Sequence, residues 1–500
     1  MRIAPSSNAR AEPRRPAVAV PVVVARPVVV ARPVAVAPVP PVRSCAMGGV
    51  RRAERHRGAW RRGGHGVRAT IAAVFVAGTL VAGCAQPPSE CGGFRPARLP
   101  EFVFGSAATD VSTDAMAAAA DIGYRWVRVP IRWNHLQPTV TAAPQLTRAE
   151  LAARPELVDD FARGADWSLP DRVLSRAGEL GLQVIGFVGA SSPPSLDDVA
   201  LDPARLGTES YLASQELVAR AIVRRYGPQR VGAPPGVATI RVWQTENELN
   251  IAPAATLIGW RAPSGFEGFL SSPWSDFGFQ TALLEGLRRG GLAEAPDAVT
   301  GVTINTDMAD SFNTLFGRPG WEEAVTRWRT LADVIALDTY PNYFLSGPVD
   351  GGIVGRRAAR LLELACPDQQ VMVMETGYPN GPVGRGYSAA AQGEFLAEAW
   401  ASSRDAGVSG FMPFGIVDGG DAEPEFTPRD QANLDTLGAG LRAGDLGTLA
   451  SLFLGDPEWV ATRLPELTQL VEGNWGVVRP DGTPLPAGLV VQGIAAETAG

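Results

Sequence analysis

The sequence predicts an α/β fold, a (β/α)8 TIM barrel, from the number of its apolar segments and from what lies between them. Eight short apolar runs follow residue 101, at residues 102–108, 124–131, 182–190, 240–247, 298–305, 333–340, 370–377 and 407–415. Stretches rich in Ala, Leu, Arg and Glu separate most of these runs, and several end in a Gly that suits a helix C-cap. Strands that are apolar throughout and alternate with helices form a parallel sheet covered by those helices.

An open doubly wound sheet is the competing fold. A GxGxxG sequence after the first strand would favour it, and the sequence has none there. Eight β/α units over about 330 residues fit the closed barrel instead. We therefore expect residues 101–500 to form one barrel domain.

The chain before the barrel has three expected parts. Residues 1–46 consist almost wholly of Pro, Val, Ala and Arg, so we expect a low-complexity segment outside the mature protein, with Met47 as the alternative start. Seven Arg then precede the apolar run 69–83, which is shorter than the roughly 20 residues of a transmembrane helix. This order predicts a signal peptide at 47–83. Residues 84–100, rich in Pro and Gly, are expected to form a tether.

The signal peptide ends in the sequence LVAGC, which resembles the bacterial lipobox. The resemblance implies that Cys84 is lipidated and becomes the mature N-terminus. We therefore expect an extracytoplasmic lipoprotein, anchored to the cell membrane through this lipid. The alternatives are a plain signal anchor or a buried Cys.

Charge and composition exclude several kinds of function. The mature chain from Cys84 onward would carry a net charge of −19, which disfavours nucleic acid as a partner. The sequence contains no Lys, so Schiff-base and P-loop chemistry are excluded. Of three His, only His135 lies in the mature chain, which excludes a multi-His zinc site. We expect no cofactor and no metal. Cys91 and Cys366 remain as a possible disulfide, with free thiols as the alternative.

Two glutamates follow predicted strands. The fourth run leads into Asn247 and Glu248, and the seventh ends at Glu375. In a TIM barrel, the carboxyl ends of the strands carry the reactive side chains. Glycoside hydrolysis needs one carboxylic acid to protonate the leaving oxygen and one carboxylate to attack or to activate water. Two glutamates at these positions are what a glycosidase requires, and the alternative is that both are acidic residues of surface loops.

Around these glutamates, residues 101–500 resemble the clan A retaining glycoside hydrolases, which include cellulases, mannanases and galactanases. The clan's acid/base pair matches Asn247-Glu248, and its nucleophile matches Glu375 in the sequence ETGYP. The clan's strand-two Arg matches Arg128 in WVRVPIRWNHLQP, and its strand-six Tyr matches Tyr340 in ALDTYPNY. The sequence NWGVVRPDGTPLPAG at 474–488 is similar to the clan's closing segment.

The resemblance implies a retaining double displacement on a β-linked oligo- or polysaccharide. Glu375 would be the nucleophile, kept ionised by Arg128 and by the Tyr340 hydroxyl. Glu248 would be the acid/base, and Asn247 would bind the sugar 2-hydroxyl. The alternative is a barrel lipoprotein that binds glycans or cell wall without cleaving them.

Aromatic side chains near the strand ends are candidate sugar platforms, and the alternative for each is core packing. The candidates are Trp133, Trp243, Tyr343, Phe344 and Tyr378. The clan carries a Trp on strand eight that underlies the sugar at the cleavage site, and this chain has GFMPF at 410–414 instead.

Overall fold

The computed structural model describes residues 90–107, 112–138, 145–189, 207–251, 273–307, 320–343, 347–419, 426–443, 445–464, 466–467, 471 and 473–498. The chain divides into a unit of residues 1–65 and a unit of residues 66–500, and every described residue belongs to the second unit. The predictions for residues 1–46 and 47–83, and for lipidation of Cys84, therefore lie outside the described residues. No helix in the described part of the chain is long and apolar enough to span a membrane.

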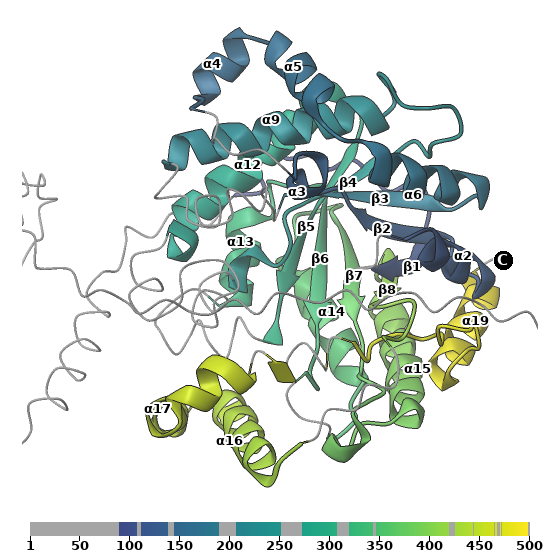
Figure 1. Cartoon of the computed structure of the whole chain (residues 1–500), viewed down its shortest axis with the longest axis vertical. Helices are drawn as coiled ribbons and strands as arrows, with labels where there is room; N and C mark the ends of the chain where they lie inside the picture. Colours follow the sequence, from purple (N-terminus) through teal and green to yellow (C-terminus); the bar gives the residue numbers. More distant parts are fainter. Residues whose placement is uncertain are drawn as a thin grey trace, which may run out of the picture. The chain divides into compact units, whose positions relative to one another are not determined.

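Eight parallel strands form a closed barrel in the order of the sequence, which confirms the predicted fold (Figure 1). Each of the eight predicted apolar runs contains one strand. The strands are β1 (Val103–Ala107), β2 (Trp126–Pro130), β3 (Gln183–Val188), β4 (Val242–Thr245), β5 (Val299–Asn305), β6 (Val334–Thr339), β7 (Gln370–Thr376) and β8 (Gly410–Pro413). Pairing of Val103 with Gly410 and of Phe104 with Phe411 closes the barrel between β1 and β8.

Helices surround the strands, as Figure 1 shows. They are α2 (Thr113–Asp121), α6 (Ser168–Glu179), α9 (Thr208–Tyr226), α12 (Phe277–Glu294), α13 (Trp321–Trp328), α14 (Gly352–Leu364), α15 (Ala389–Ala406) and α19 (Pro486–Thr498). Local sequence defines the ends of α15: the Ser388 hydroxyl accepts a hydrogen bond from Ala391 N, and Gly407 takes the left-handed conformation, with φ of 88°, at the C-cap.

Successive side chains of a strand point to opposite faces of the sheet, and this alternation produces two apolar layers. One layer lies between strands and helices and includes Val127, Trp243, Leu337 and Val373. The other fills the barrel, with Trp126, Ile185, Val242, Val334, Ala336, Met372, Met374 and Met412 among its members. Every second residue therefore points into the barrel, except where the pairing of β7 is irregular.

The N-terminal segment 90–100 closes the amino ends of the strands. Leu99 is buried in the apolar layer inside the barrel, and its backbone N–H donates to Gln370 Oε1 at 2.6 Å. Cys91 forms a disulfide with Cys366, which lies between α14 and β7. The second half of the predicted tether is thus fixed to the barrel, and the pairing left open by the sequence is present.

Two insertions interrupt the β/α pattern. Between β2 and β3 lie α3 (Trp133–Leu136), α4 (Arg148–Ala153) and α5 (Glu156–Gly164), and between β8 and α19 lie α16 (Pro428–Ala443), α17 (Leu446–Gly455) and the π-helix η6 (Trp459–Arg463). The second insertion has a small apolar core of its own, which includes Leu437, Leu449 and Trp459. Short 3-10 turns complete the described elements: η2 (Leu249–Ile251), η3 (Pro273–Ser275) and η5 (Val383–Arg385).

Candidate active site

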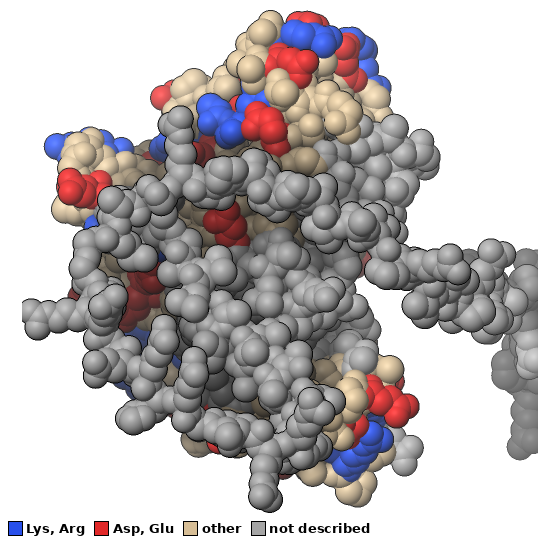
Figure 2. Space-filling view, turned by 90° about the vertical axis from the view of Figure 1, so that its left-hand side faces the viewer, with Lys and Arg blue, Asp and Glu red and all other residues tan. Residues whose placement is uncertain are grey.

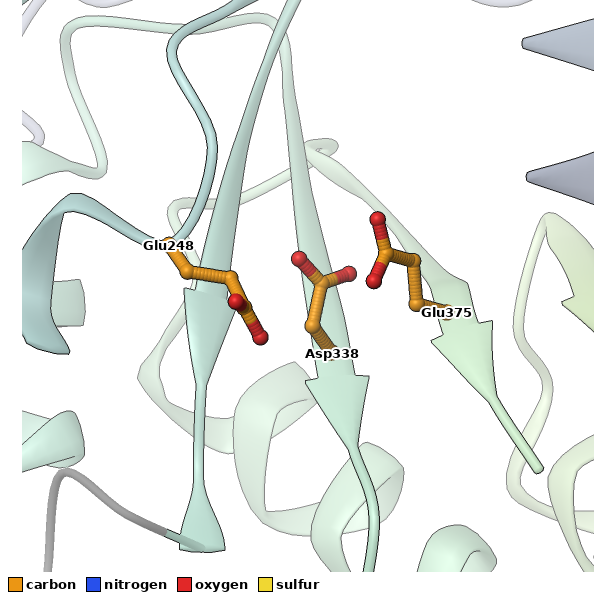
Figure 3. A group of neighbouring side chains, drawn as sticks. All are labelled: Glu248, Asp338 and Glu375. Atoms are coloured by element: carbon orange, nitrogen blue, oxygen red, sulfur yellow. The ribbon is translucent and has the colours of Figure 1, made fainter. Parts of the chain in front are cut away.

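Three carboxylates meet at the carboxyl ends of β4, β6 and β7 (Figure 3). Each of these carboxylates, on Glu248, Asp338 and Glu375, has one oxygen that lies within 4.8 Å of an oxygen of the other two. Asp338 and Glu375 are buried, whereas Glu248 is partly exposed. The sequence predicted that the two glutamates lie together, and it missed Asp338. Acidic side chains are also seen recessed below the surface in a view from one side of the molecule (Figure 2).

Glu375 reaches this cluster because of an irregularity in β7. Met372 and Met374 point into the barrel, so strict alternation would turn Glu375 outward. The pairing of β6 with β7 shifts after Leu337, so that Asp338 stands opposite Glu375 and Met374 has no partner. A β-bulge of this kind places an extra residue on one strand and re-aims the next side chain. The bulge therefore turns the carboxylate of Glu375 toward Glu248.

Both oxygens of Glu375 accept hydrogen bonds. Arg128 Nη1 donates to Oε1 in a buried ion pair, and Tyr340 Oη donates to Oε2 at 2.7 Å. Burial, followed by the charge of Glu375, raises the pKa of Tyr340 well above its ordinary value, so its hydroxyl remains a donor. Burial opposes the charge of Arg128, but Glu375 and Asp338 outweigh it, and the pKa of Arg128 is raised. Glu375 is thus held by a charged donor on one oxygen and by a neutral hydroxyl donor on the other.

A strained turn after β4 positions Glu248. Glu246 and Glu248 both take the left-handed conformation, with φ of 57° and 46°, which costs about 1–3 kcal/mol each and is typical of functional sites. The end of β5 supports the turn: Glu248 N donates to Thr303 Oγ1 at 3.0 Å, and Asn305 Nδ2 donates to Glu248 Oε1 at 2.6 Å. Asn305 is a second site residue that the sequence analysis missed.

Asn247 links the two glutamates. Its side-chain oxygen accepts from Arg128 Nη2 at 2.9 Å and from Gln244 Nε2 at 3.1 Å. Its side-chain nitrogen donates to Glu248 Oε2 at 3.4 Å. One guanidinium thus contacts both Glu375 and the residue that precedes Glu248.

An aromatic cluster lies behind Tyr340. Its ring packs edge-on against Trp475, at 5.0 Å between centroids, and against Phe414, at 5.6 Å. A Cβ on Gly377 would lie 2.9 Å from the Trp475 ring, so this glycine permits the close packing. The chain therefore brings a Trp to this place from the closing segment, whereas Phe414 directly follows β8.

Three of the five predicted sugar platforms lie in the apolar core. Tyr343 is partly buried against Trp475, with 5.9 Å between ring centroids, and Phe344 lies outside the described residues. Trp133, Trp243 and Tyr378 are only 2%, 1% and 1% exposed and belong to the layer between strands and helices. The alternation of side chains along β4 explains the burial of Trp243. Its neighbour Gln244 points into the barrel and donates a hydrogen bond to Asn247, so Trp243 points outward to the helices. Such burial leaves almost no ring surface for stacking on a sugar, so these residues act as structural supports.

The carboxylate cluster is also the group of described residues that could supply oxygen ligands to a cation. Arg128 already neutralises Glu375, however, and a cation would have to displace this guanidinium or lie beside it.

Comparison with known proteins supports the fold. No protein-family model matches the chain, and no curated protein sequence matches it. Among solved structures, the β-glycosidase from Thermosphaera aggregans aligns with a TM-score of 0.53 at 11% identity, over 80% of this chain and 97% of that one. The β-glucosidase from Pyrococcus furiosus aligns with a TM-score of 0.50 at 12% identity, over 80% and 96%.

An exo-β-1,4-mannosidase from Opitutaceae bacterium strain TAV5 aligns with a TM-score of 0.48 at 14% identity, over 83% of this chain. This chain spans 62% of the length of that mannosidase. At 11% and 12% identity, the alignments with the β-glycosidase and the β-glucosidase show the barrel architecture alone.

Proposed function

We propose that this protein is a glycoside hydrolase that cleaves β-glycosidic bonds with retention of configuration. The observation that carries the proposal is the placement of Glu248 and Glu375 at the ends of β4 and β7, where one carboxylate oxygen of each lies within 4.8 Å of one oxygen of the other. Carboxyl groups are about 5–5.5 Å apart in retaining enzymes and about 6.5–9.5 Å apart in inverting ones. The shorter spacing leaves no room for a water molecule between nucleophile and sugar.

The first step forms a glycosyl-enzyme. A Glu375 oxygen attacks the anomeric carbon, the bond from this carbon to the leaving oxygen breaks, and that oxygen takes the proton of Glu248. In the second step, Glu248 removes a proton from water, the water oxygen bonds to the anomeric carbon, and Glu375 leaves as a carboxylate. Each glutamate ends the cycle in the protonation state in which it began.

The surrounding side chains suit these roles. Arg128 and Tyr340 occupy both oxygens of Glu375, and they hold it in one orientation before the attack. Asn305 orients Glu248, and Asn247 is placed next to it for the sugar 2-hydroxyl. Trp475 holds Tyr340 in place through ring packing.

The substrate class we propose is a β-linked oligo- or polysaccharide. The clan-like residues around both glutamates support it. So do the similar barrels, because the two with TM-scores of at least 0.5 described above are a β-glycosidase and a β-glucosidase. These names belong to those proteins, and identity near 11% does not transfer a particular sugar.

A panel of aryl β-glycosides and β-linked polysaccharides tests the activity, with Glu375→Ala measured alongside the unaltered protein. We expect turnover on some member of the panel and its loss in the variant. Binding without turnover across the panel would favour the glycan-binding lipoprotein instead.

We also propose that the protein is exported and lipid-anchored through Cys84. The basic segment, apolar run and lipobox-like sequence support this. The Cys91–Cys366 disulfide agrees with it, because such bonds persist in oxidising compartments. Metabolic labelling with a fatty acid tests the proposal: we expect label on the unaltered chain and none on Cys84→Ala, and label on both would contradict it.

A further inference from the structure

The two-step mechanism leaves Asp338 without a role. This residue is on β6, points into the barrel like Val334 and Ala336, and is 0% exposed. Neither of its carboxylate oxygens has a partner at full hydrogen-bond geometry among the described residues. The Thr303 hydroxyl lies close enough to lower the pKa of Asp338 slightly, but this hydroxyl also donates to Asn247 Oδ1 at 3.5 Å. Figure 3 shows its carboxyl group between those of Glu248 and Glu375.

The charges around Asp338 are unbalanced. The charged or titratable groups that face it in the described part of the chain are Glu375 from β7, Glu248 after β4, Arg128 from β2 and Tyr340 on its own strand. Arg128 is the cation of this group, and it already donates to Glu375 and Asn247. A buried carboxylate without a donor or a cation of its own is very costly, so the site can hold one negative charge against Arg128.

We infer that Asp338 is a positioning residue that carries a proton in the working enzyme and donates it, as an O–H hydrogen bond, to the Glu375 carboxylate. This inference rests on the function proposed above. The register supports Glu375 as the acceptor, because Asp338 stands directly opposite it beside the bulge in β7. A carboxylate has about four lone-pair sites, so Glu375 can accept this bond in addition to those from Arg128 and Tyr340.

The protonated Asp338 keeps the site neutral through the reaction. Before the first step, Arg128 balances ionised Glu375, and Glu248 and Asp338 are both neutral. After the step, Glu375 is an ester, and Arg128 balances the Glu248 carboxylate. An ionised Asp338 would add an uncompensated buried charge to both states. Consistent with this, burial and the charges of Glu375 and Glu248 raise the pKa of Asp338 well above its ordinary value, although Arg128 opposes the shift.

Infrared difference spectroscopy of the full chain at neutral pH tests the inference without any substrate. The comparison is between the unaltered protein and Asp338→Asn, in which an amide of the same shape keeps a donor. We expect the difference spectrum to contain the carbonyl band of one protonated carboxylic acid that the variant has lost, because the band of protonated Glu248 is common to both proteins and cancels. Loss of a carboxylate band instead would overturn the inference. Asp171→Asn is the matched control and should lose a carboxylate band, because Asp171 is paired with Arg225.

If Asp338→Asn does not fold, carbon-13 NMR of the aspartate carboxyl carbons in the unaltered chain tests whether Asp338 carries a proton. One aspartate carboxyl should remain protonated at neutral pH, and none doing so would overturn the inference. Neither spectrum depends on turnover. The proton on Asp338 can therefore be confirmed even if the protein hydrolyses no glycoside, and it can be absent even if the protein is a glycoside hydrolase.

Kinetics then test the positioning role. Asp338→Ala removes the donor to Glu375, so we expect kcat to fall roughly 10- to 100-fold with little change in KM. Asp338→Asn should recover most of this loss and leave the alkaline limb of the pH profile in place. If Asp338 were ionised, its charge would help Glu248 keep its proton, and Asp338→Asn would move the alkaline limb to lower pH. That shift would contradict the inference.

Discussion

Arg128 on β2 donates a hydrogen bond to the carboxylate of Glu375 on β7, and both side chains are less than a tenth exposed. The two strands are not neighbours in the barrel, so the pair joins distant parts of the closed sheet. The same guanidinium also donates to Asn247. Arg128 therefore sets the position of the proposed nucleophile relative to the turn that carries Glu248.

Replacing Arg128 should damage both activity and stability. Arg128→Lys keeps the charge but loses the planar fork that reaches two acceptors, so we expect a large fall in kcat with the fold retained. Arg128→Ala leaves Glu375 buried without its cation, which should lower the free energy of unfolding by about 3–5 kcal/mol. Steady-state kinetics and urea unfolding measure the two effects. An Arg128→Lys variant with unaltered kcat would show that the bridge has no part in the reaction.

Tyr340→Phe should lower kcat while the barrel stays intact. The change removes the hydroxyl that donates to Glu375 Oε2 and keeps the ring that packs against Trp475. A hydrogen bond to a charged group contributes about 1.5–3 kcal/mol, so a loss of roughly 10- to 100-fold is expected. Tyr226→Phe is the matched control, because it removes a Tyr–carboxylate bond to Asp171 away from the site. Equal kinetics for both variants would remove Tyr340 from the mechanism.

Glu248→Ala should affect substrates according to their leaving groups. A sugar leaving group needs the proton of Glu248, and general acid catalysis contributes about 10²–10⁴-fold. An acidic phenol leaves without that proton, so the first step on an activated aryl glycoside should be nearly preserved. Pre-steady-state release of the phenol is the measurement. If activated and unactivated substrates lose the same factor, Glu248 is not the acid.

The stability of the protein should depend on pH through Asp338. Its raised pKa in the folded state means that the folded chain binds more protons than the unfolded chain above the ordinary pKa of an aspartate. Stability is therefore lost as pH rises through that window, by at most about 1.4 kcal/mol per pH unit. Asp338→Asn lacks this term and should melt at a higher temperature than the unaltered protein at neutral pH. The two melting temperatures should converge in acid, and a constant difference at all pH values would contradict the assignment.

Removing the disulfide should lower stability without altering catalysis. Cys91 and Cys366 are separated by 275 residues, and a disulfide closing a long loop contributes about 2–4 kcal/mol. The bond lies at the amino ends of the strands, on the opposite end of the barrel from the carboxylates. We expect Cys91→Ser/Cys366→Ser to unfold at lower urea and to keep its kcat/KM. A large loss of kcat/KM in the folded double variant would show that the N-terminal segment also affects the site.

The sequence predicted all eight strands and both glutamates because these follow from local patterns. A parallel barrel requires apolar runs, and its reactive residues follow those runs, which is how Glu248 and Glu375 were found. Asp338 left a signal that was not used: it lies in phase with the inward residues Val334 and Ala336, and a carboxylate inside an apolar strand needs an explanation.

Other features depended on contacts that no local pattern encodes. Regular alternation in β7 would point Glu375 outward. The bulge that turns it into the barrel is visible only in the pairing of β7 with β6. Trp243 follows alternation and is buried behind the strands, so its place beside Glu248 in the sequence was misleading. Trp475 reaches Tyr340 from far along the chain through tertiary packing.

Covalent trapping tests the central proposal most directly. The protein would be incubated with a panel of activated 2-deoxy-2-fluoro β-glycosides, which slow the second step, and then digested for mass spectrometry, with Glu375→Gln as the control. We predict one sugar per chain, attached to Glu375 and absent from the variant. A sugar attached to another residue, or turnover of the parent glycosides with inversion and no attached sugar, would contradict the assignment of Glu375 as nucleophile.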